Sequence, residues 1–416
     1  MNARLNALKF IVECLGASNS DATNQRLRLA IERQNLDWQV VRGLSDAERI
    51  TPALWIALRN RGLATALPST FRGDLWKVHL LNSLRNKRLK EQALCAFRAL
   101  NDIGVQPMIL KGGASLFDMT FGDPGSRMMV DLDLLVPRER AEDCWAALRA
   151  REYDPISIDF DYANHHHLRP LHRPGAQGTL EVHRELLPIS VAAALPASFA
   201  WKQCQSRTES GARFSVPSPT VRVLHSFLHT AIVDRSFSRA DLSLKALLEL
   251  ASLQRSFGHH IDWGSVRETV VEHGLSGAFD GWMYSLHQLL GDSIPDHVET
   301  TLRSRIHLEQ VYLQVRWEWT AWVVDRLTWF SAENICNRFA CSDRFWSLLN
   351  GRVRLASSML GKSLLHLANR QYRQTKLDSG ATTLNSTANR HQVADDSVNH
   401  QSSQREPECA LRDKAS

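Results

Sequence analysis

Several features are scarce in this sequence, and each scarcity argues against a class of protein. Among the 416 residues there are seven cysteines, but no two of them have the Cys-x-x-Cys spacing of a zinc or redox site. Isolated cysteines in apolar helical patterns are mostly inert core residues, so we expect a reducing, cytoplasmic location. No run of about 18 apolar residues occurs, which predicts that the chain has no membrane span.

Charge of one sign is also scarce. The chain has 50 Lys and Arg against 44 Asp and Glu, a net charge of +6 that is mild for this length. Such a balance is compatible with an anionic ligand such as a nucleotide. A nucleic-acid partner is not expected, because no basic stripe is concentrated around the motifs described below. In the first sixteen residues, Asn6, Lys9 and Glu13 interrupt the apolar positions. This pattern is typical of an amphipathic helix rather than of the unbroken apolar run of a secretion signal.

The composition and the apolar periodicity predict a folded chain of two or three structural units. Hydrophobic residues make up 44% of the sequence and charged residues 23%, as in soluble globular proteins. Apolar residues recur at helical spacing near both ends of the chain, with Ser218 as a candidate N-cap. We therefore expect a helical N-terminal segment (1–100), an α/β core (101–215), a helical C-terminal domain (216–368) and a disordered tail (369–416).

Within the core, short apolar runs alternate with a helical pattern. Pro137 ends one of these runs, and helices are expected to return from about residue 190. The predicted fold is α/β (α+β), with a small mixed sheet flanked by N- and C-terminal helical segments. The expected strands are 105–110, 128–136, 156–171 and 179–184, with a short helix at 114–121 and a longer helix at 138–151.

The run Val130–Val136 carries the first candidate site. Side chains alternate between the faces of a strand, so Asp131 and Asp133 share one face, roughly 6–7 Å apart at the backbone. Two like charges on a mostly apolar strand are costly unless something compensates them, and Mg²⁺ or Mn²⁺ would do so. A strand with one solvated acidic face explains the same spacing, because Asp-x-Asp is common.

A second strand, Thr179–His183, repeats the alternation. Glu181 and His183 face one way, and Leu180 and Val182 face the other. If this strand lies beside the first, Glu181 becomes a third carboxylate of the same site. Three carboxylates are what a two-metal phosphoryl-transfer centre needs.

A glycine-containing turn precedes both strands. Gly112 and Gly113 let backbone N–H groups approach phosphates closely, and Lys111 is placed to neutralise phosphate charge. A Gly-Gly turn is usually only a turn, however. Arg127, four residues before Asp131, is equally compatible with phosphate binding and with structural pairing.

The order of these motifs resembles the uncharacterised nucleotidyltransferase family of bacteria, which belongs to the DNA polymerase beta-like nucleotidyltransferase superfamily. The resemblance covers roughly residues 90–300 and includes a later helical stretch with His225 and His229. The superfamily's usual turn is Gly-Ser, whereas here it is Gly-Gly and the nearest serine is Ser115. The matching stretches are LKGGA, GDPGSR, DLDLLV and LEVHREL, which place the family pattern on Lys111, Gly112, Arg127, Asp131, Asp133, Glu181 and His183.

Together, the motifs and the resemblance predict a metal-dependent enzyme that transfers a nucleoside monophosphate from an NTP to an unknown acceptor, a small molecule or a protein. The alternative is a catalytically degenerate nucleotide-binding or protein-interaction module of the same fold. In the enzyme, Asp131, Asp133 and Glu181 are the catalytic and metal-binding residues. The nucleotide would be bound by Lys111, Gly112, Gly113, Ser115 and Arg127. The catalytic residues would in turn be contacted and oriented by His183 and His229.

Further histidines and one helical pair allow other interpretations. His165, His166 and His167 invite a zinc interpretation, but consecutive residues of a strand point to opposite faces and cannot all bind one ion. An exposed strand or a substrate contact is therefore favoured. Lys245 and Glu249 share a helix face and are placed to pair with each other.

Overall fold

The structure is a computed structural model that describes residues 2–33, 35–118, 120–157, 162–163, 165–329 and 352–353. The predicted disordered tail, 369–416, lies outside these residues. Met1–Trp329 form one compact unit, to which everything below refers. Of the helices described, none is both long and apolar enough to cross a membrane.

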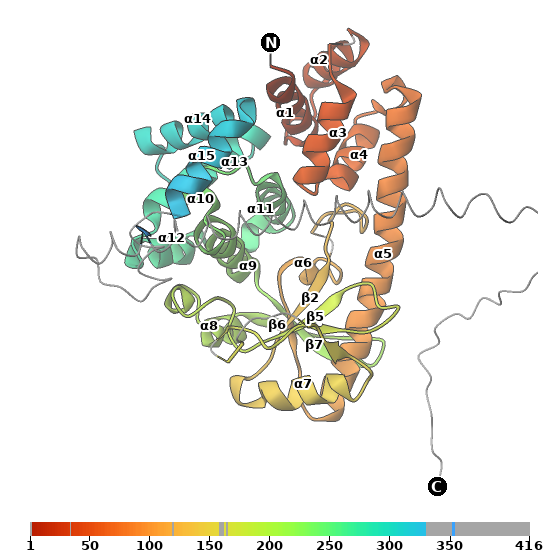
Figure 1. Cartoon of the computed structure of the whole chain (residues 1–416), viewed down its shortest axis with the longest axis vertical. Coiled ribbons are helices and arrows are strands. Elements are labelled where there is room, and N and C mark those ends of the chain that lie inside the picture. Colours follow the sequence, from red (N-terminus) through yellow and green to blue (C-terminus); the bar gives the residue numbers. More distant parts are fainter. Residues whose placement is uncertain are drawn as a thin grey trace, which may run out of the picture. The chain divides into compact units, whose positions relative to one another are not determined.

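The N-terminal segment is helical, as predicted, and its first three helices begin at capping side chains. Asn2, Ser20 and Asp37 each accept a hydrogen bond from a first-turn amide. The last helix, α5, runs along the sheet (Figure 1) and contributes to two hydrophobic cores, with Leu75 in the first and Phe97 in the second. The helices are α1 (Ala3–Leu15), α2 (Asp21–Glu32), α3 (Trp38–Ala47), α4 (Thr51–Asn60) and α5 (Ser69–Asp102), with a 3₁₀ turn η1 (Ala64–Ala66).

The core contains a mixed sheet of seven strands in the order β3-β4-β5-β2-β1-β7-β6. The pairs β2–β5 and β1–β7 are parallel, and the other neighbouring strands are antiparallel. The strands are β1 (Met108–Ile109), β2 (Asp131–Leu135), β3 (Asp154–Pro155), β4 (Leu171–His172), β5 (Thr179–His183), β6 (Cys204–Glu209) and β7 (Ala212–Pro217). The prediction of a mixed α/β core with flanking helices is thus confirmed.

The two faces of strand β2 have different surroundings. Leu132 and Leu134 are fully buried in the second core, together with residues of α5 and α7 (Ala141–Arg149). Asp131 and Asp133 lie on the opposite face, as the alternation predicted. Because β5 is in register with β2, Glu181 is the direct neighbour of Asp133.

Three details of the predicted core are wrong. Helices were expected from about residue 190, but β6 and β7 form a hairpin there. Its turn, Ser210-Gly211, has positive φ at both positions, as this type of two-residue hairpin turn requires. Of the expected strand 156–171, only Leu171 belongs to a strand among the described residues, as the first residue of β4, and the short strand β3 ends before residue 156. The first helix of the core, α6, spans Lys111–Ala114 and therefore contains the glycine turn that was expected to precede it.

The C-terminal segment returns to helices, and Ser218 caps the first long one as predicted. Its apolar side chains, such as Phe227 and Phe279, share the first core with α1–α4. The helices are α8 (Ala197–Lys202), α9 (Pro219–Phe227), α10 (Ser236–Arg239), α11 (Leu244–Phe257), α12 (Trp263–Glu272), α13 (Ser276–Leu290), α14 (Leu302–Arg316) and α15 (Glu318–Trp329). Short 3₁₀ turns are η2 (Arg138–Arg140), η3 (Ala192–Ala194) and η5 (Gly258–His260), and η4 (Leu228–Val233) is a π-helical turn.

Candidate active site

Asp133 is the most deeply buried charged group of the site, with a side chain that is 2% exposed. Its Oδ1 accepts hydrogen bonds from Lys111 Nζ at 2.7 Å and from His183 Nε2 at 2.9 Å. Burial alone would raise the pKa of this carboxyl, but Lys111 and His183 hold it well below its usual range. Asp133 is therefore a permanent anion with fixed partners.

Lys111 reaches Asp133 from a strained backbone position. Its φ is +46°, a left-handed conformation that costs a non-glycine residue about 1 kcal/mol or more. Burial opposes the charged ammonium, but Asp133 outweighs it, so the pKa of Lys111 is raised. The lysine that was expected to bind phosphate thus also compensates a carboxylate.

Asp131 differs sharply from its neighbour. Its side chain is partly buried and faces a cavity, and it forms no hydrogen bond or ion pair with the residues described. Burial and then the charge of Asp133 raise the pKa of Asp131. This carboxylate is an anion whose cost is only partly compensated by the protein.

Glu181 lies where the sequence predicted a third carboxylate. Its Oε2 is 3.5 Å from His183 Nε2 and 3.7 Å from His167 Nε2. One potential ligand atom each from Asp133, Glu181 and His183 lies within 4.8 Å of the others. These residues are therefore close enough to share one cation.

In front of Asp131 is a cavity of about 310 Å³, at the lower end of the size range of small-molecule pockets. The sheet wall consists of the glycine turn and the start of β2. The helical wall consists of α9, the π-helical turn, α11 and Arg49 from between α3 and α4. The lining residues are Arg49, Lys111, Gly112, Arg127, Met129, Asp131, Arg222, His225, Ser226, His229, Thr230, Asp234, Ser243, Lys245, Ala246 and Glu249.

Two arginines of the cavity are fixed by buried ion pairs. Arg127 donates to Glu249 at 2.6 Å, and Arg222 donates to Asp118 at 2.5 Å. Arg127 therefore pairs with Glu249 of α11 rather than with Asp131 or Asp133. The same ion pair takes the place of the pairing between Glu249 and Lys245 that was expected within the helix. Burial opposes the charged Glu249, but Arg127 lowers its pKa. These pairs hold the sheet and the helices together around the cavity.

Two other cations of the cavity, Arg49 and Lys245, make no ion pair with the residues described. Arg49 lies between α3 and α4 with a φ of +55°. Burial, and then the nearby charge of Arg127, lower the pKa of Lys245 to about 8. No local sequence pattern indicated Arg49, because its position at the cavity depends on how the N-terminal helices pack.

The two histidines of the helical wall have different environments. His225 is buried, its Nε2 has no hydrogen-bond partner among the described residues, and burial holds its pKa well below its usual range. His229 Nδ1 lies 3.1 Å from Asp234 Oδ2. His229 and Thr230 belong to the π-helical turn, a distortion that is frequent at functional sites.

The glycine turn has one face toward the cavity and one toward the core. Gly112 lines the cavity, and a Cβ there would lie 3.3 Å from the Arg127 guanidinium. A Cβ on Gly113 would lie 2.6 Å from the Ile109 side chain, so Gly113 allows α6 to pack against β1. Ser115 Oγ is buried without a partner among the described residues, and Ser115 is not in the cavity lining.

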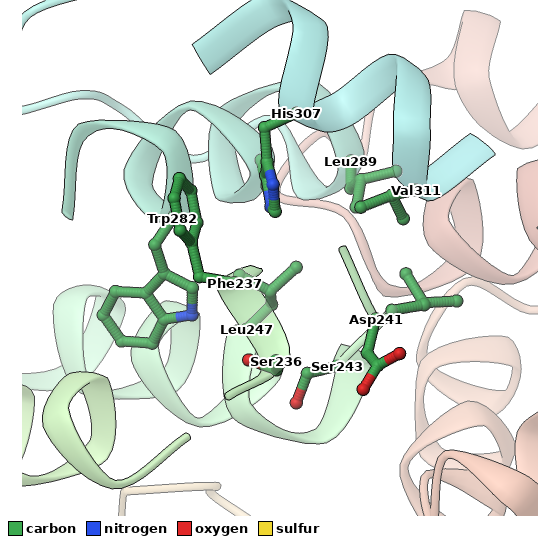
Figure 2. A pocket seen from close by; sticks show the side chains of 11 residues that line it. Ser236, Phe237, Asp241, Ser243, Leu247, Trp282, Leu289, His307 and Val311 are labelled. Carbon is green, nitrogen blue, oxygen red and sulfur yellow. The ribbon is translucent and has the colours of Figure 1, made fainter. Parts of the chain in front are cut away.

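A second pocket, between the C-terminal helices, is unsuitable as a substrate site. Figure 2 shows Phe237 and His307 on one side of it, with ring centroids 4.1 Å apart. Its volume of about 20 Å³ is roughly that needed by one water molecule. The pocket is a packing defect of the helical core.

The histidine run does not have the structure expected of it. His165–His167 do not form a strand; only His167 makes an isolated bridge, with His183. The premise that their side chains point to opposite faces is wrong, because potential ligand atoms of all three lie within 4.8 Å of one another. Burial, and then His183, lower the pKa of His166 to about 2 and that of His167 to about 4, so both are neutral near pH 7.

Comparison with known proteins is informative at the family level. The family described as uncharacterised nucleotidyltransferase matches residues 34–291, more than half of the chain. That range contains the carboxylate strands, the glycine turn and the helical wall of the cavity. Neither a curated protein nor a solved structure matches the chain.

Proposed function

The chain belongs to the uncharacterised nucleotidyltransferase family, and we propose that it transfers a nucleoside monophosphate from an NTP to an acceptor hydroxyl in the cavity in front of Asp131. The observation that carries this proposal is the state of Asp131. It is a partly buried carboxylate that faces the cavity, next to a second carboxylate, without a hydrogen bond or ion pair from the described part of the chain. A divalent cation would supply the compensation that Asp131 lacks.

The donor atoms fit a hard cation. Asp131, Asp133 and Glu181 offer carboxylate oxygens, which Mg²⁺ and Mn²⁺ prefer, on two adjacent strands in register. These three residues would hold the metal ions. When bound, the metal ions would neutralise the carboxylates and lower the pKa of the acceptor hydroxyl.

The reaction requires the acceptor oxygen to attack the α-phosphorus. A bond forms between these atoms, the bond from the α-phosphorus to the bridging oxygen breaks, and pyrophosphate leaves with the electron pair. In this proposal the hydroxyl proton passes to Glu181, whose Oε2 lies 3.5 Å from His183 Nε2. Asp133, held by Lys111 and His183, keeps the neighbouring strand positions fixed.

The helical wall would bind the triphosphate. Arg49 and Lys245 are cations without ion-pair partners among the described residues, and both line the cavity that contains Asp131. A triphosphate placed between this wall and the carboxylates would satisfy both cations. Lys111, Gly112 and Arg127 would contact it from the sheet side, and the buried His225 Nε2 offers a further polar contact.

A catalytically degenerate module remains the alternative, and one observation favours it. Lys111 already compensates Asp133 at 2.7 Å, so this carboxylate does not need a metal ion to be stable. In that case the cavity would bind a nucleotide through its cations alone, and binding would not depend on Mg²⁺.

Calorimetric titration with a non-hydrolysable ATP or CTP analogue, with and without Mg²⁺, separates the two. The enzyme requires Mg²⁺-dependent binding that Asp131→Ala abolishes and that Asp143→Ala, an exposed aspartate of α7, leaves unchanged. Binding of equal strength with and without Mg²⁺ would support the degenerate module. Absence of nucleotide binding in the wild-type protein would reject both.

A further inference from the structure

Three consecutive histidines form a compact cluster beside the carboxylates. The ring centroids of His165, His166 and His167 are 4.1–4.8 Å apart. Nitrogen atoms of all three lie within 4.8 Å of one another. Tetrahedral zinc, with Zn–N bonds of 2.0–2.1 Å, needs ligand nitrogens roughly 3.4 Å apart. Side-chain rotations that move these nitrogens by about 1 Å would bring them to that spacing.

The backbone under the cluster is fixed. Leu168 N donates to Val182 O at 2.8 Å, and Arg184 N donates to His166 O at 2.8 Å. The histidine run is therefore attached to β5 on both sides, next to Glu181. Since its backbone is held by these bonds, metal binding would order only side chains.

His166 and His167 each keep a ring nitrogen available as a ligand, and His165 Nδ1 accepts a hydrogen bond from His167 N at 3.5 Å. His167 Nδ1 is 2.7 Å from Leu168 O, so this nitrogen donates its proton to a backbone carbonyl and Nε2 remains an acceptor. This arrangement is the one that usually orients a metal-bound histidine. His166 Nδ1 is buried and has no hydrogen-bond partner among the described residues.

A fourth position is open beside the cluster. His165 and His166 line a pocket of about 290 Å³, together with Arg138, Arg184, Glu185 and Leu187. Three protein nitrogens plus an open position for water or a ligand atom is the arrangement of many catalytic zinc sites. Glu181, 3.7 Å from His167 Nε2, supplies a negative charge near the cluster.

We propose that His165, His166 and His167 bind one transition-metal ion of the zinc class, at a site separate from Asp131 and Asp133. The chemistry distinguishes the two sites, because imidazole nitrogens suit Zn²⁺ whereas carboxylate oxygens suit Mg²⁺. The ion would fix the three imidazole side chains relative to one another and leave its open position toward the adjoining pocket.

The test is a competition titration of chelator-treated, full-length protein with Zn²⁺ and a chromophoric chelator, followed by Co²⁺ substitution. The wild-type protein is expected to bind one equivalent of Zn²⁺ and to give the visible absorption of tetrahedral Co²⁺. His166→Asn should weaken binding at least about tenfold. The melting temperature of the wild-type protein should rise with Zn²⁺, and that of His166→Asn should not.

Two control variants separate this site from others. A double substitution of the exposed pair His259 and His260 by asparagine should leave Zn²⁺ binding unchanged, and so should Asp131→Ala. Equal Zn²⁺ affinity in the wild-type and His166→Asn proteins would overturn the proposal, as would loss of binding in the His259 and His260 variant. Circular dichroism of His166→Asn without metal shows whether the variant folds, and His167→Asn provides a second test of the same site.

Discussion

The two walls of the cavity differ in charge and in origin. The sheet wall carries Asp131, and Asp133 and Glu181 lie next to it on β2 and β5 without lining the cavity. The helical wall carries Arg49 and Lys245, which are almost 200 residues apart in the sequence. The anionic wall is thus specified locally by strand alternation, whereas the cationic wall exists only once the N- and C-terminal helices have packed together.

The difference also divides the work of the proposed reaction. The sheet wall has the carboxylates suited to metal ions and to the acceptor proton, and the helical wall has cations suited to phosphate groups. The ion pair between Arg127 and Glu249 links the two walls at 2.6 Å. Substitutions on one wall should therefore affect catalysis, and substitutions on the other should affect nucleotide affinity.

The largest effect is expected on the sheet wall. For any acceptor that supports turnover, Asp131→Ala should reduce the rate of pyrophosphate release by about 10³-fold or more, because a carboxylate of the proposed metal site is lost. Asp143→Ala on α7 should retain the wild-type rate. Retention of more than a tenth of the wild-type rate by Asp131→Ala would remove this residue from the catalytic centre.

The two aspartates should differ in their effect on stability. Asp133→Ala leaves the Lys111 ammonium and His183 without their buried partner, and should lower the free energy of unfolding by about 3–5 kcal/mol. Asp131→Ala removes an anion that the protein compensates poorly, and should be neutral or stabilising. Urea denaturation of both variants measures the contrast. Equal destabilisation by the two would contradict the distinction between a fixed and an uncompensated carboxylate.

On the helical wall, Lys245→Ala should weaken nucleotide binding by about tenfold at pH 7, since one charge-assisted contact is worth roughly 1.4 kcal/mol or more. The groups around Lys245 are Arg127, Glu249, Arg49 and Asp131. Its pKa of about 8 in the free protein means that the ammonium is lost as the pH rises through about 8. An anionic ligand favours the charged form, so affinity should be high below pH 8 and should fall above it.

The substitution Lys245→Arg keeps the charge at all these pH values. In isothermal titration at several pH values, the nucleotide affinity of neither variant should fall above pH 8. Lys245→Arg should bind the nucleotide tightly at all these pH values, and Lys245→Ala should bind it weakly. A decline that persists in Lys245→Arg would assign the titration to another group. The stability of the free protein should depend on pH in the opposite direction to ligand affinity. Between about pH 8 and 10.5 the unfolded chain keeps the Lys245 proton that the folded chain has lost, so the free energy of unfolding contributed through Lys245 increases with pH there.

The sequence predicted the sheet wall of the cavity better than its helical wall. Alternation placed Asp131 and Asp133 on one strand face, and Glu181 and His183 on one face of a later strand. Glu181 was expected as a third carboxylate only if the two strands are neighbours, which β2 and β5 are. Strand pairing across 50 residues and the register itself are tertiary properties that alternation alone does not fix.

The remaining errors also have tertiary causes. Glu249 pairs with Arg127, 122 residues away, rather than with Lys245 one helical turn away, because the arginine is brought to α11 by the sheet. The histidine run was interpreted with strand geometry, but its backbone bends at His165 and His166, just before His167 bridges to β5. The hairpin of β6 and β7 had a local signal in Ser210-Gly211 and was missed because helical patterns on both sides dominated.

The smallest effect is expected at Ser115, the residue nearest to the serine of the superfamily's usual turn. Its hydroxyl is buried without a partner among the described residues, and it does not line the cavity in front of Asp131. If the hydroxyl contacts neither wall nor nucleotide, Ser115→Ala should change the affinity for the NTP analogue by less than about twofold and should leave stability unchanged or slightly increased, because a buried polar group without a partner is costly. A tenfold loss of affinity would instead place Ser115 with Lys111 and Gly112 as a phosphate contact, and would mean that α6 moves toward the cavity when the nucleotide binds.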